Sequence, residues 1–340
     1  MHAAPQARRQ RAFVIVGALL LAALASLLVA GMTGSVALHV AELPDALDQL
    51  LHGRQDSLAA SLLALRAGRA LVAFVSGGAL ALAGVMMQAL LRNPLADPYV
   101  LGISAGASVG ALLALLLMCA AVTVDASALV GAVAVSMLLY LLARRDLRGG
   151  VAAEGGASQL LLTGVILSSA CMALVTLMLS IAPEGQLRSM VFWMIGDLAG
   201  ASPRLLPWLV LGGGLAYALR NARAMNVAAL HADAAATLGI RVGALRKGLF
   251  LVSGLLTASS VTSAGAIGFV GLIVPHACRF AFGPDHRVLV PSAVLAGGGF
   301  LVLCDTLART VVAPVQLPVG AITALIGAPV FLYQLHRLRA

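Results

Sequence analysis

Long apolar runs alternate with short polar segments along almost the whole chain. Each run is about as long as a helix must be to cross a hydrocarbon layer about 30 Å thick. The pattern predicts an all-α polytopic membrane protein with about ten transmembrane helices. The predicted spans cover residues 12–32, 70–91, 100–118, 126–143, 158–182, 204–220, 247–264, 266–282, 288–308 and 317–335.

The clearest break in this pattern lies between the second and third runs. No charged residue occurs from Ala70 to Leu91, and two prolines, Pro94 and Pro98, follow within a few positions. Proline cannot donate a helical N–H, and it pushes the preceding residue out of the helical region. We therefore expect a rigid, non-helical turn that contains Asn93 and Asp97, after which the helix restarts.

Two segments are too polar to span. Residues 222–246 predict short helices, because alanine favours helix, Asp233 suits a first turn and Gly239 suits the position just after a helix end. Such a segment is either a connector or a docking element. Residues 188–203 contain Trp193, which alone would indicate an anchor at the membrane interface.

Composition supports the membrane assignment. The chain is 61% hydrophobic, 10% charged and 4% aromatic, so it has too few charges to cover a water-soluble surface. The net charge of +9 could indicate nucleic-acid binding, but the basic residues form short clusters between apolar runs and lack interleaved aromatic residues. We therefore interpret the positive charge as a topology signal and expect no nucleic-acid partner.

The distribution of basic residues predicts the orientation. An even number of spans places both termini on one side, and the positive-inside rule makes that side cytoplasmic. The N-terminal run could be a signal peptide, but its length and the many later spans favour a retained first helix. The basic residues that this topology places inside, sixteen of the twenty-two, are Arg8, Arg9, Arg11, Arg92, Arg144, Arg145, Arg148, Arg220, Arg223, Arg241, Arg246, Lys247, Arg279, Arg287, Arg337 and Arg339.

The chain carries no motif that would bind ATP or a metal ion. A Walker A loop needs a lysine followed by serine or threonine, and the single lysine, Lys247, is followed by glycine. Four cysteines lie in or near apolar runs without metal-ligand spacing, so we interpret them as packing residues. Any ATP and magnesium would therefore belong to a partner ATPase.

An ion-coupled secondary transporter is the main alternative mechanism. It would normally place an ionisable side chain near the middle of a span, where such groups are costly. Asp305 and Arg309 come closest, one helical turn apart near the outer end of the ninth span. Their spacing also fits a self-neutralising i,i+4 pair at an interface.

An intramembrane serine hydrolase is a remote alternative. The segment from Gly102 to Gly106 matches the Gly-x-Ser-x-Gly pattern, with Ser104 as the nucleophile. A serine nucleophile needs a base within hydrogen-bond reach, and no histidine lies at mid-depth in a predicted span. Gly102, Gly106 and Gly110 recur every four residues, which instead favours close helix packing.

Three stretches carry a family resemblance. They are Gly84–Gly106, with the turn Asn-Pro-Leu-Ala-Asp-Pro at its centre; Phe269–Arg287, with Pro275, His276 and Arg279; and Leu317–Phe331. Together they closely resemble the permease subunits of the iron-chelate and cobalamin uptake family of ATP-binding-cassette (ABC) importers. The resemblance covers roughly residues 60–340.

This resemblance implies a fold and a set of partners. The chain would be one transmembrane permease domain, residues 1–340, of a type II ABC importer in the bacterial inner membrane. It would form a homodimer around the substrate path, bind two ATPase subunits and receive its cargo from a periplasmic binding protein. Because the spans offer few charges or aromatic residues, we rank haem first as cargo, ferric siderophore second and cobalamin third.

The resemblance also implies roles for individual residues. Residues 188–203 would form a short re-entrant helix beside the path. Coupling helices within residues 222–246 would dock on the ATPase, with Leu230, Ala232, Asp233, Ala236, Leu238 and Gly239 as the contact residues. Docking of the binding protein would use Arg66, Arg69 and Arg309, and the cytoplasmic gate would contain Asn93, Leu95, Ala157 and Ser158.

Overall fold

The computed structural model describes residues 5–148, 156–230, 235 and 237–339, and this part of the chain is entirely helical. It contains twelve α-helices and two short 3₁₀ helices. The first half comprises α1 (Pro5–Met32), η1 (Val40–Glu42), α2 (Leu43–Leu51), α3 (Leu58–Leu91), η2 (Pro98–Leu101), α4 (Ile103–Leu116) and α5 (Ala121–Arg148). The second half comprises α6 (Gly156–Ile181), α7 (Glu184–Ile195), α8 (Leu205–Leu230), α10 (Val242–Ala264), α11 (Val270–Phe282), α12 (His286–Thr310) and α13 (Val319–Arg339).

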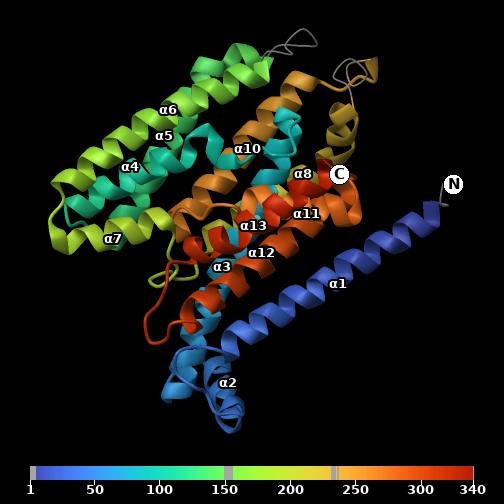
Figure 1. Cartoon of the computed structure of the whole chain (residues 1–340). Helices are drawn as coiled ribbons and strands as arrows, with labels where there is room; N and C mark the ends of the chain where they lie inside the picture. The colour runs from blue at the N-terminus through green and yellow to red at the C-terminus, as the bar shows by residue number, and fades with distance from the viewer. Residues whose placement is uncertain (1–4, 149–155, 231–234, 236, 340) are drawn as a thin grey trace.

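Helix α3 is the central element of the bundle. Its 34 residues extend over about 51 Å at 1.5 Å per residue. Most of its side chains are buried, because α1, α8, α10, α11 and α12 surround it (Figure 1). Its buried face is rich in glycine and alanine, which allows neighbouring helices to approach its backbone.

Two glycine pairs show how close that approach is. Gly77 of α3 packs on Gly297 of α12, where an added Cβ would lie 2.9 Å from the carbonyl carbon of Gly297. Gly84 packs on Gly271 of α11, where an added Cβ would lie 2.7 Å from the carbonyl carbon. Any larger side chain at Gly84 would therefore push α3 and α11 apart.

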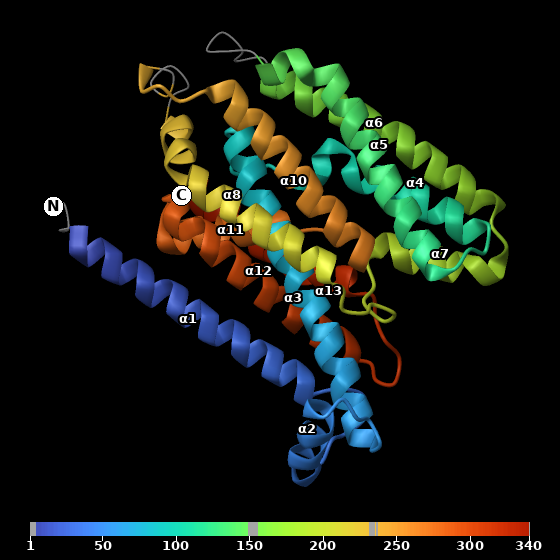
Figure 2. The same cartoon turned by 180° about the vertical axis from the view of Figure 1, so that it is seen from behind.

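A second group of helices, α4 to α7, packs against one side of this central bundle (Figures 1 and 2). Gly106 of α4 faces Gly131 of α5, and Gly110 faces the backbone of Ser127. The glycine ridge on α4 thus serves helix packing, as its four-residue spacing predicted. Long apolar side chains on α5 and α6 remain exposed in the isolated chain.

The number of membrane spans is only partly confirmed. All ten predicted runs coincide with a helix, but by length and composition only six described helices could cross a membrane: α1, α3, α5, α6, α10 and α12. Helices α4 and α11 are shorter than predicted. Backbone conformations with positive φ at Gly102 (78°) and Phe269 (72°) delay their starts.

The segment expected to form separate coupling helices is also shorter than predicted. Helix α8 continues through Ala222 to Leu230, and α10 begins at Val242. No glycine or proline interrupts the chain from Leu215 to Leu230, so the helix extends beyond its apolar part. Only residues 231–241 remain between the two long helices.

The described chain begins and ends at the same end of the bundle. The start of α1 and the end of α13 lie there, while α2 lies at the opposite end in both views (Figures 1 and 2). This arrangement fits an even number of membrane crossings. We call the end that carries α2 the outer end and the opposite end the inner end.

Candidate functional site

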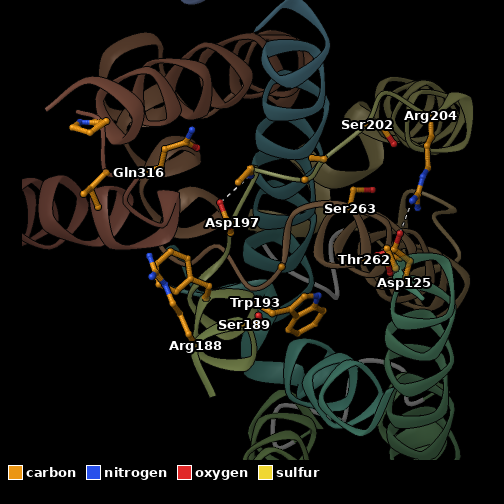
Figure 3. A pocket seen from close by; sticks show the side chains of 18 residues that line it. Asp125, Arg188, Ser189, Trp193, Asp197, Ser202, Arg204, Thr262, Ser263 and Gln316 are labelled. Atoms are coloured by element: carbon orange, nitrogen blue, oxygen red, sulfur yellow. Dashed lines mark hydrogen bonds and ion pairs between the residues drawn. The ribbon is translucent and has the colours of Figure 1, made fainter. Parts of the chain in front are cut away.

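A cavity of about 660 Å³ opens at the outer end (Figure 3). Its wall combines α7, the loop at 196–204, the ends of α5 and α10, and the loop between α12 and α13. We call it the outer cavity. Its volume lies in the usual range for small-molecule sites, about 300–1,000 Å³.

Glycine residues fix the position of α7 at this cavity. Gly196 ends α7 with a φ of 91°, a conformation that glycine adopts without strain. Its carbonyl oxygen accepts a hydrogen bond from the N–H of Gly320, at the start of α13 (3.3 Å). Asp197 donates its N–H to the carbonyl oxygen of Ala264, the last residue of α10 (3.1 Å). A short helix is therefore present here, but it covers Glu184–Ile195, earlier than the predicted 188–203, and residues 196–204 form a loop. The ends of two long helices anchor its C-terminus.

Four charged side chains line the outer cavity. Arg204 and Asp125 form an ion pair in which Nη2 and Oδ2 lie 2.5 Å apart. Asp197 accepts a hydrogen bond from the N–H of Ala199 (2.9 Å), which closes a local turn (Figure 3). The guanidinium carbon of Arg188 lies 5.3 Å from the ring centre of Phe192, one turn further along α7.

A buried group of charges lies beside this cavity and comprises Arg66, Arg69, Asp305 and Arg309; we call it the arginine–aspartate cluster. Asp305 is 1% exposed. Arg69 binds its carboxylate from α3 through Nη2 at 2.7 Å and Nε at 2.9 Å. Arg309 Nε lies 3.1 Å from its second oxygen. The predicted pair on α12 is thus part of a larger group that also holds α3.

The cluster also ties in the segments around it. Arg309 donates to the carbonyl oxygen of Ala30 on α1 (3.2 Å), and Arg66 donates to that of Met32 (3.1 Å). Arg69 donates to Oε1 of Gln316, which lines the outer cavity (2.8 Å). The three predicted docking arginines therefore lie together at the outer end, but they are only 5–8% exposed and have partners within the chain.

The predicted turn between α3 and η2 is present at the inner end. Arg92 ends α3 in a left-handed conformation, and Asn93 Oδ1 accepts a hydrogen bond from the N–H of Leu95 (2.9 Å). Asp97 caps η2 by accepting from the N–H of Tyr99 (2.7 Å). Removal from water raises the pKa of Asp97 to about 6, although this N–H opposes the rise.

The gate residues are only partly described. Asn93 and Leu95 are exposed. Ala157 and Ser158 lie in the first turn of α6, but their side chains fall outside the described residues. The turn and α6 are in contact, since a Cβ added to Gly164 would lie 2.6 Å from the carbonyl oxygen of Val100. This contact joins η2 to α6 about two helical turns after Ala157 and Ser158, so the gate formed by these residues stays a prediction.

The segment after α8 ends as its sequence predicts. Gly239 has a φ of 78°, and the N–H of Ile240 donates to the carbonyl oxygen of Ala235 (3.0 Å). These features define the glycine-terminated helix end known as a Schellman motif. Leu238 is 70% exposed. Ala232, Asp233, Ala236 and the side chain of Leu230 lie outside the described residues.

An amide side chain that sequence inspection missed holds the inner end of α8. Asn226 Nδ2 donates to Asp285 Oδ1 (2.7 Å), and Asn226 Oδ1 accepts from the N–H of His286 (2.9 Å). Burial alone would raise the pKa of Asp285, but this amide and the N–H of Arg287 donate to its carboxylate, and the pKa is lowered. The contact fastens α8 to the start of α12.

The described residues give no support to hydrolase or metal chemistry. Ser104 has no hydrogen bond to a histidine in the described part of the chain; its carbonyl oxygen accepts from Ser108 (3.0 Å). Within the same residues, no group of three or more His, Cys, Asp or Glu side chains could hold a metal ion. All four cysteines are free thiols.

Comparisons with known proteins agree on one family. Residues 14–337 match the FecCD transport family. The hemin transport system permease protein of Yersinia pestis is 38% identical over 289 residues, which cover 81% of this chain and 83% of that protein. The vitamin B12 import system permease protein of Escherichia coli is 39% identical over 280 residues, with 81% and 83% covered.

A solved structure supports the same relationship. It is described as a metal-chelate type ABC transporter in an inward-facing conformation. Its TM-score is 0.81 at 29% identity, and the match covers 95% of this chain and 99% of that one.

The arginine–aspartate cluster predicts a strong effect of Asp305→Asn. Removing the carboxylate charge leaves Arg69 and Arg309 buried without their acid, which typically costs about 3–5 kcal/mol of unfolding free energy. The matched control is Asp48→Asn, because Asp48 forms an exposed pair with Arg54 at 3.9 Å; exposed pairs contribute about 0–1 kcal/mol. Thermal unfolding in detergent measures both variants. Equal unfolding temperatures would show that the cluster does not stabilise the fold.

Proposed function

The chain belongs to the FecCD transport family of ABC importer permeases, and from this premise we propose that it imports a metal chelate, with haem favoured, ferric siderophore next and cobalamin third. The outer cavity is the observation that carries the proposal. It is open at one end of the bundle, and the aromatic rings of Phe192 and Trp193 form part of its wall. A relative of similar length is a hemin transport permease, and other relatives import vitamin B12.

The energy for transport would come from a partner. The chain has no Walker A sequence, so ATP and magnesium would bind in two separate ATPase subunits. The alternative, coupling to an ion gradient, needs a carboxylate that binds and releases the ion. Asp305 is a poor candidate, because two arginines hold it in a buried cluster at the outer end.

A second copy of the chain would complete the path as a homodimer. The exposed leucine, valine and isoleucine side chains of α5 and α6 could contact lipid or that copy. The topology rule would place both termini in the cytoplasm of a bacterial cell and the outer cavity in the periplasm. A periplasmic binding protein would then deliver the chelate to the outer cavity.

Docking of that binding protein would involve the arginine–aspartate cluster. Three arginines against one aspartate leave an excess of positive charge near the outer surface, which suits acidic residues on a partner. At the inner end, Leu238 and Gly239 would contribute to the surface that receives the ATPase. The turn with Asn93 and Leu95, together with Ala157 and Ser158, would close the path there.

The energy source is tested by uptake into proteoliposomes that contain the permease and its partner ATPase. Uptake of chelate should require ATP hydrolysis and should persist when ionophores collapse proton and sodium gradients. A partner ATPase that binds but does not hydrolyse ATP is the control. Uptake that stops with the gradients while ATP is abundant would support an ion-coupled carrier instead.

Binding-protein docking is tested with Arg66→Met. This change removes a charge but keeps an unbranched side chain, and the carbonyl partners of Arg66 belong to residues near the exposed loop after α1. The affinity of the binding protein should fall about tenfold, and its dependence on salt should become shallower. Arg54→Met, at an exposed outer arginine, should leave both unchanged. An unaltered affinity of the Arg66 variant would limit this arginine to a structural role.

ATPase docking is tested with Leu238→Asp. A charge on this exposed leucine should release the ATPase during purification, because apolar anchors often contribute about 2 kcal/mol or more to an interface. Leu51→Asp is the matched control, since Leu51 is 85% exposed and ends α2 at the outer end. Both variants should fold normally. A complex that stays intact with Leu238→Asp would identify this segment as a connector.

A further inference from the structure

Of the two arginines that line the outer cavity, Arg188 is the one that has no carboxylate partner among the described residues. Four charged groups line this cavity: Asp125, Arg188, Asp197 and Arg204. Asp125 and Arg204 neutralise each other, and Asp197 closes its own turn. Among the described residues, Arg188 forms no ion pair with a carboxylate and no hydrogen bond through its five N–H donors.

Arg188 is exposed, and its guanidinium contacts one aromatic ring among the described residues. The guanidinium carbon lies 5.3 Å from the centre of the Phe192 ring, one helical turn away on α7. Such a contact favours the cation and leaves donor groups at the guanidinium edge accessible. The helix itself is held, because Gly196 at its end bonds to Gly320 and Asp197 bonds to Ala264. The helix that carries Arg188 is therefore anchored before any ligand arrives, which lowers the ordering cost of binding.

The cavity also offers a surface for a flat ring. Phe192 and Trp193 both line it, as Arg188 does, and the Phe192 ring contacts the Arg188 guanidinium. Aromatic side chains bind planar aromatic groups through stacked or edge contacts. A guanidinium group binds a carboxylate through two parallel hydrogen bonds. The combination suits a ligand that carries carboxylates at the edge of an aromatic ring.

The charges that line the cavity further restrict the class of ligand that fits it. Two arginines and two aspartates give the lining no net charge. An anion whose charge is spread over its whole surface would therefore be attracted by Arg188 and repelled by Asp197. A ligand with a discrete carboxylate can reach Arg188 and keep its apolar ring away from Asp197.

We propose that Arg188 binds a carboxylate of the substrate in the outer cavity, and that the substrate is a planar aromatic chelate with free carboxylate groups. Arg188 is then a specificity-determining residue of the permease itself. This inference rests on the proposed function, since it assumes that the outer cavity receives the chelate. Haem, with two propionates on a porphyrin ring, is the natural probe, and its dimethyl ester removes both charges while it keeps the ring.

The test measures ligand binding to the complex of permease and ATPase in lipid nanodiscs, without the binding protein. Haem that enters the outer cavity should quench the fluorescence of Trp193. The same titration with Trp193→Phe provides the background from other tryptophans and from haem in the lipid. We expect Arg188→Gln to weaken haem binding about tenfold and Arg188→Lys to weaken it less, because lysine keeps the charge but loses the planar fork.

Binding of the dimethyl ester distinguishes recognition of the carboxylate charge from a general loss of binding caused by misfolding. The dimethyl ester should bind the wild-type complex about tenfold more weakly than haem, and Arg188→Gln should not weaken ester binding further. This comparison on the wild-type protein needs no variant, so poor folding of a variant does not remove the test. Arg54→Gln, at an exposed outer arginine away from the cavity, should bind both ligands as the wild type does.

Three results would overturn the inference. They are equal affinities of the wild-type complex for haem and its ester, an equal loss of both ligands in Arg188→Gln, and the absence of Trp193 quenching by haem. If any of these results is found and the wild-type complex still imports another chelate with ATP, the inference fails and the permease function stands. If no haem, siderophore or cobalamin is taken up with ATP, the proposed function itself fails.

Discussion

Close backbone contact at small residues is the constraint on which the arrangement of helices depends. Lipid tails are as apolar as leucine, so apolar side chains gain little by leaving lipid for another helix, and packing must supply the attraction. Helix α3 meets this condition through Gly77 and Gly84, which touch α12 and α11 at backbone distance. The same device joins α4 to α5 through Gly106 and Gly131. Longer side chains at these glycine positions would separate α3 from α11 and α12, and α4 from α5.

Given this packing, the charged groups at the outer end occupy one connected region. Asp305 of α12 binds Arg69 of α3, and Arg69 also binds Gln316 in the wall of the outer cavity. Arg309 and Arg66 reach the end of α1. Loss of an acid from a buried group of this kind is costly, because the remaining charges have no water around them. The wall of the outer cavity is therefore coupled to the relative positions of three long helices.

Features that depend on neighbouring residues in the sequence could be predicted, whereas contacts between residues far apart in the sequence could not. The Asn93 to Pro98 turn and the helix end at Gly239 follow from proline and glycine in their immediate sequence, and both are present. The pair of Asp305 and Arg309 is four residues apart and was visible for that reason. Its partner Arg69 is separated from Asp305 by 236 positions, so only the folded structure brings them together. The lengths of α4 and α11 also escaped prediction, since the positive φ of Phe269 has no signature in hydrophobicity.

The two ends of the molecule differ in the interactions that hold them. Buried ion pairs join the helices at the outer end, whereas the amide of Asn226 joins α8 to α12 at the inner end. A hydrogen bond from an amide to a charged carboxylate contributes about 1.5–3 kcal/mol, less than the roughly 3–5 kcal/mol that is typically lost when a buried charge loses its partner. Breaking the Asn226 contact therefore costs less than breaking the cluster, and the turn with Asn93 and the segment before α10 are exposed at the same end. For a permease driven by a cytoplasmic ATPase, the energy would then enter at the end where this weaker contact lies, while the outer cavity would keep the geometry that we propose for ligand selection.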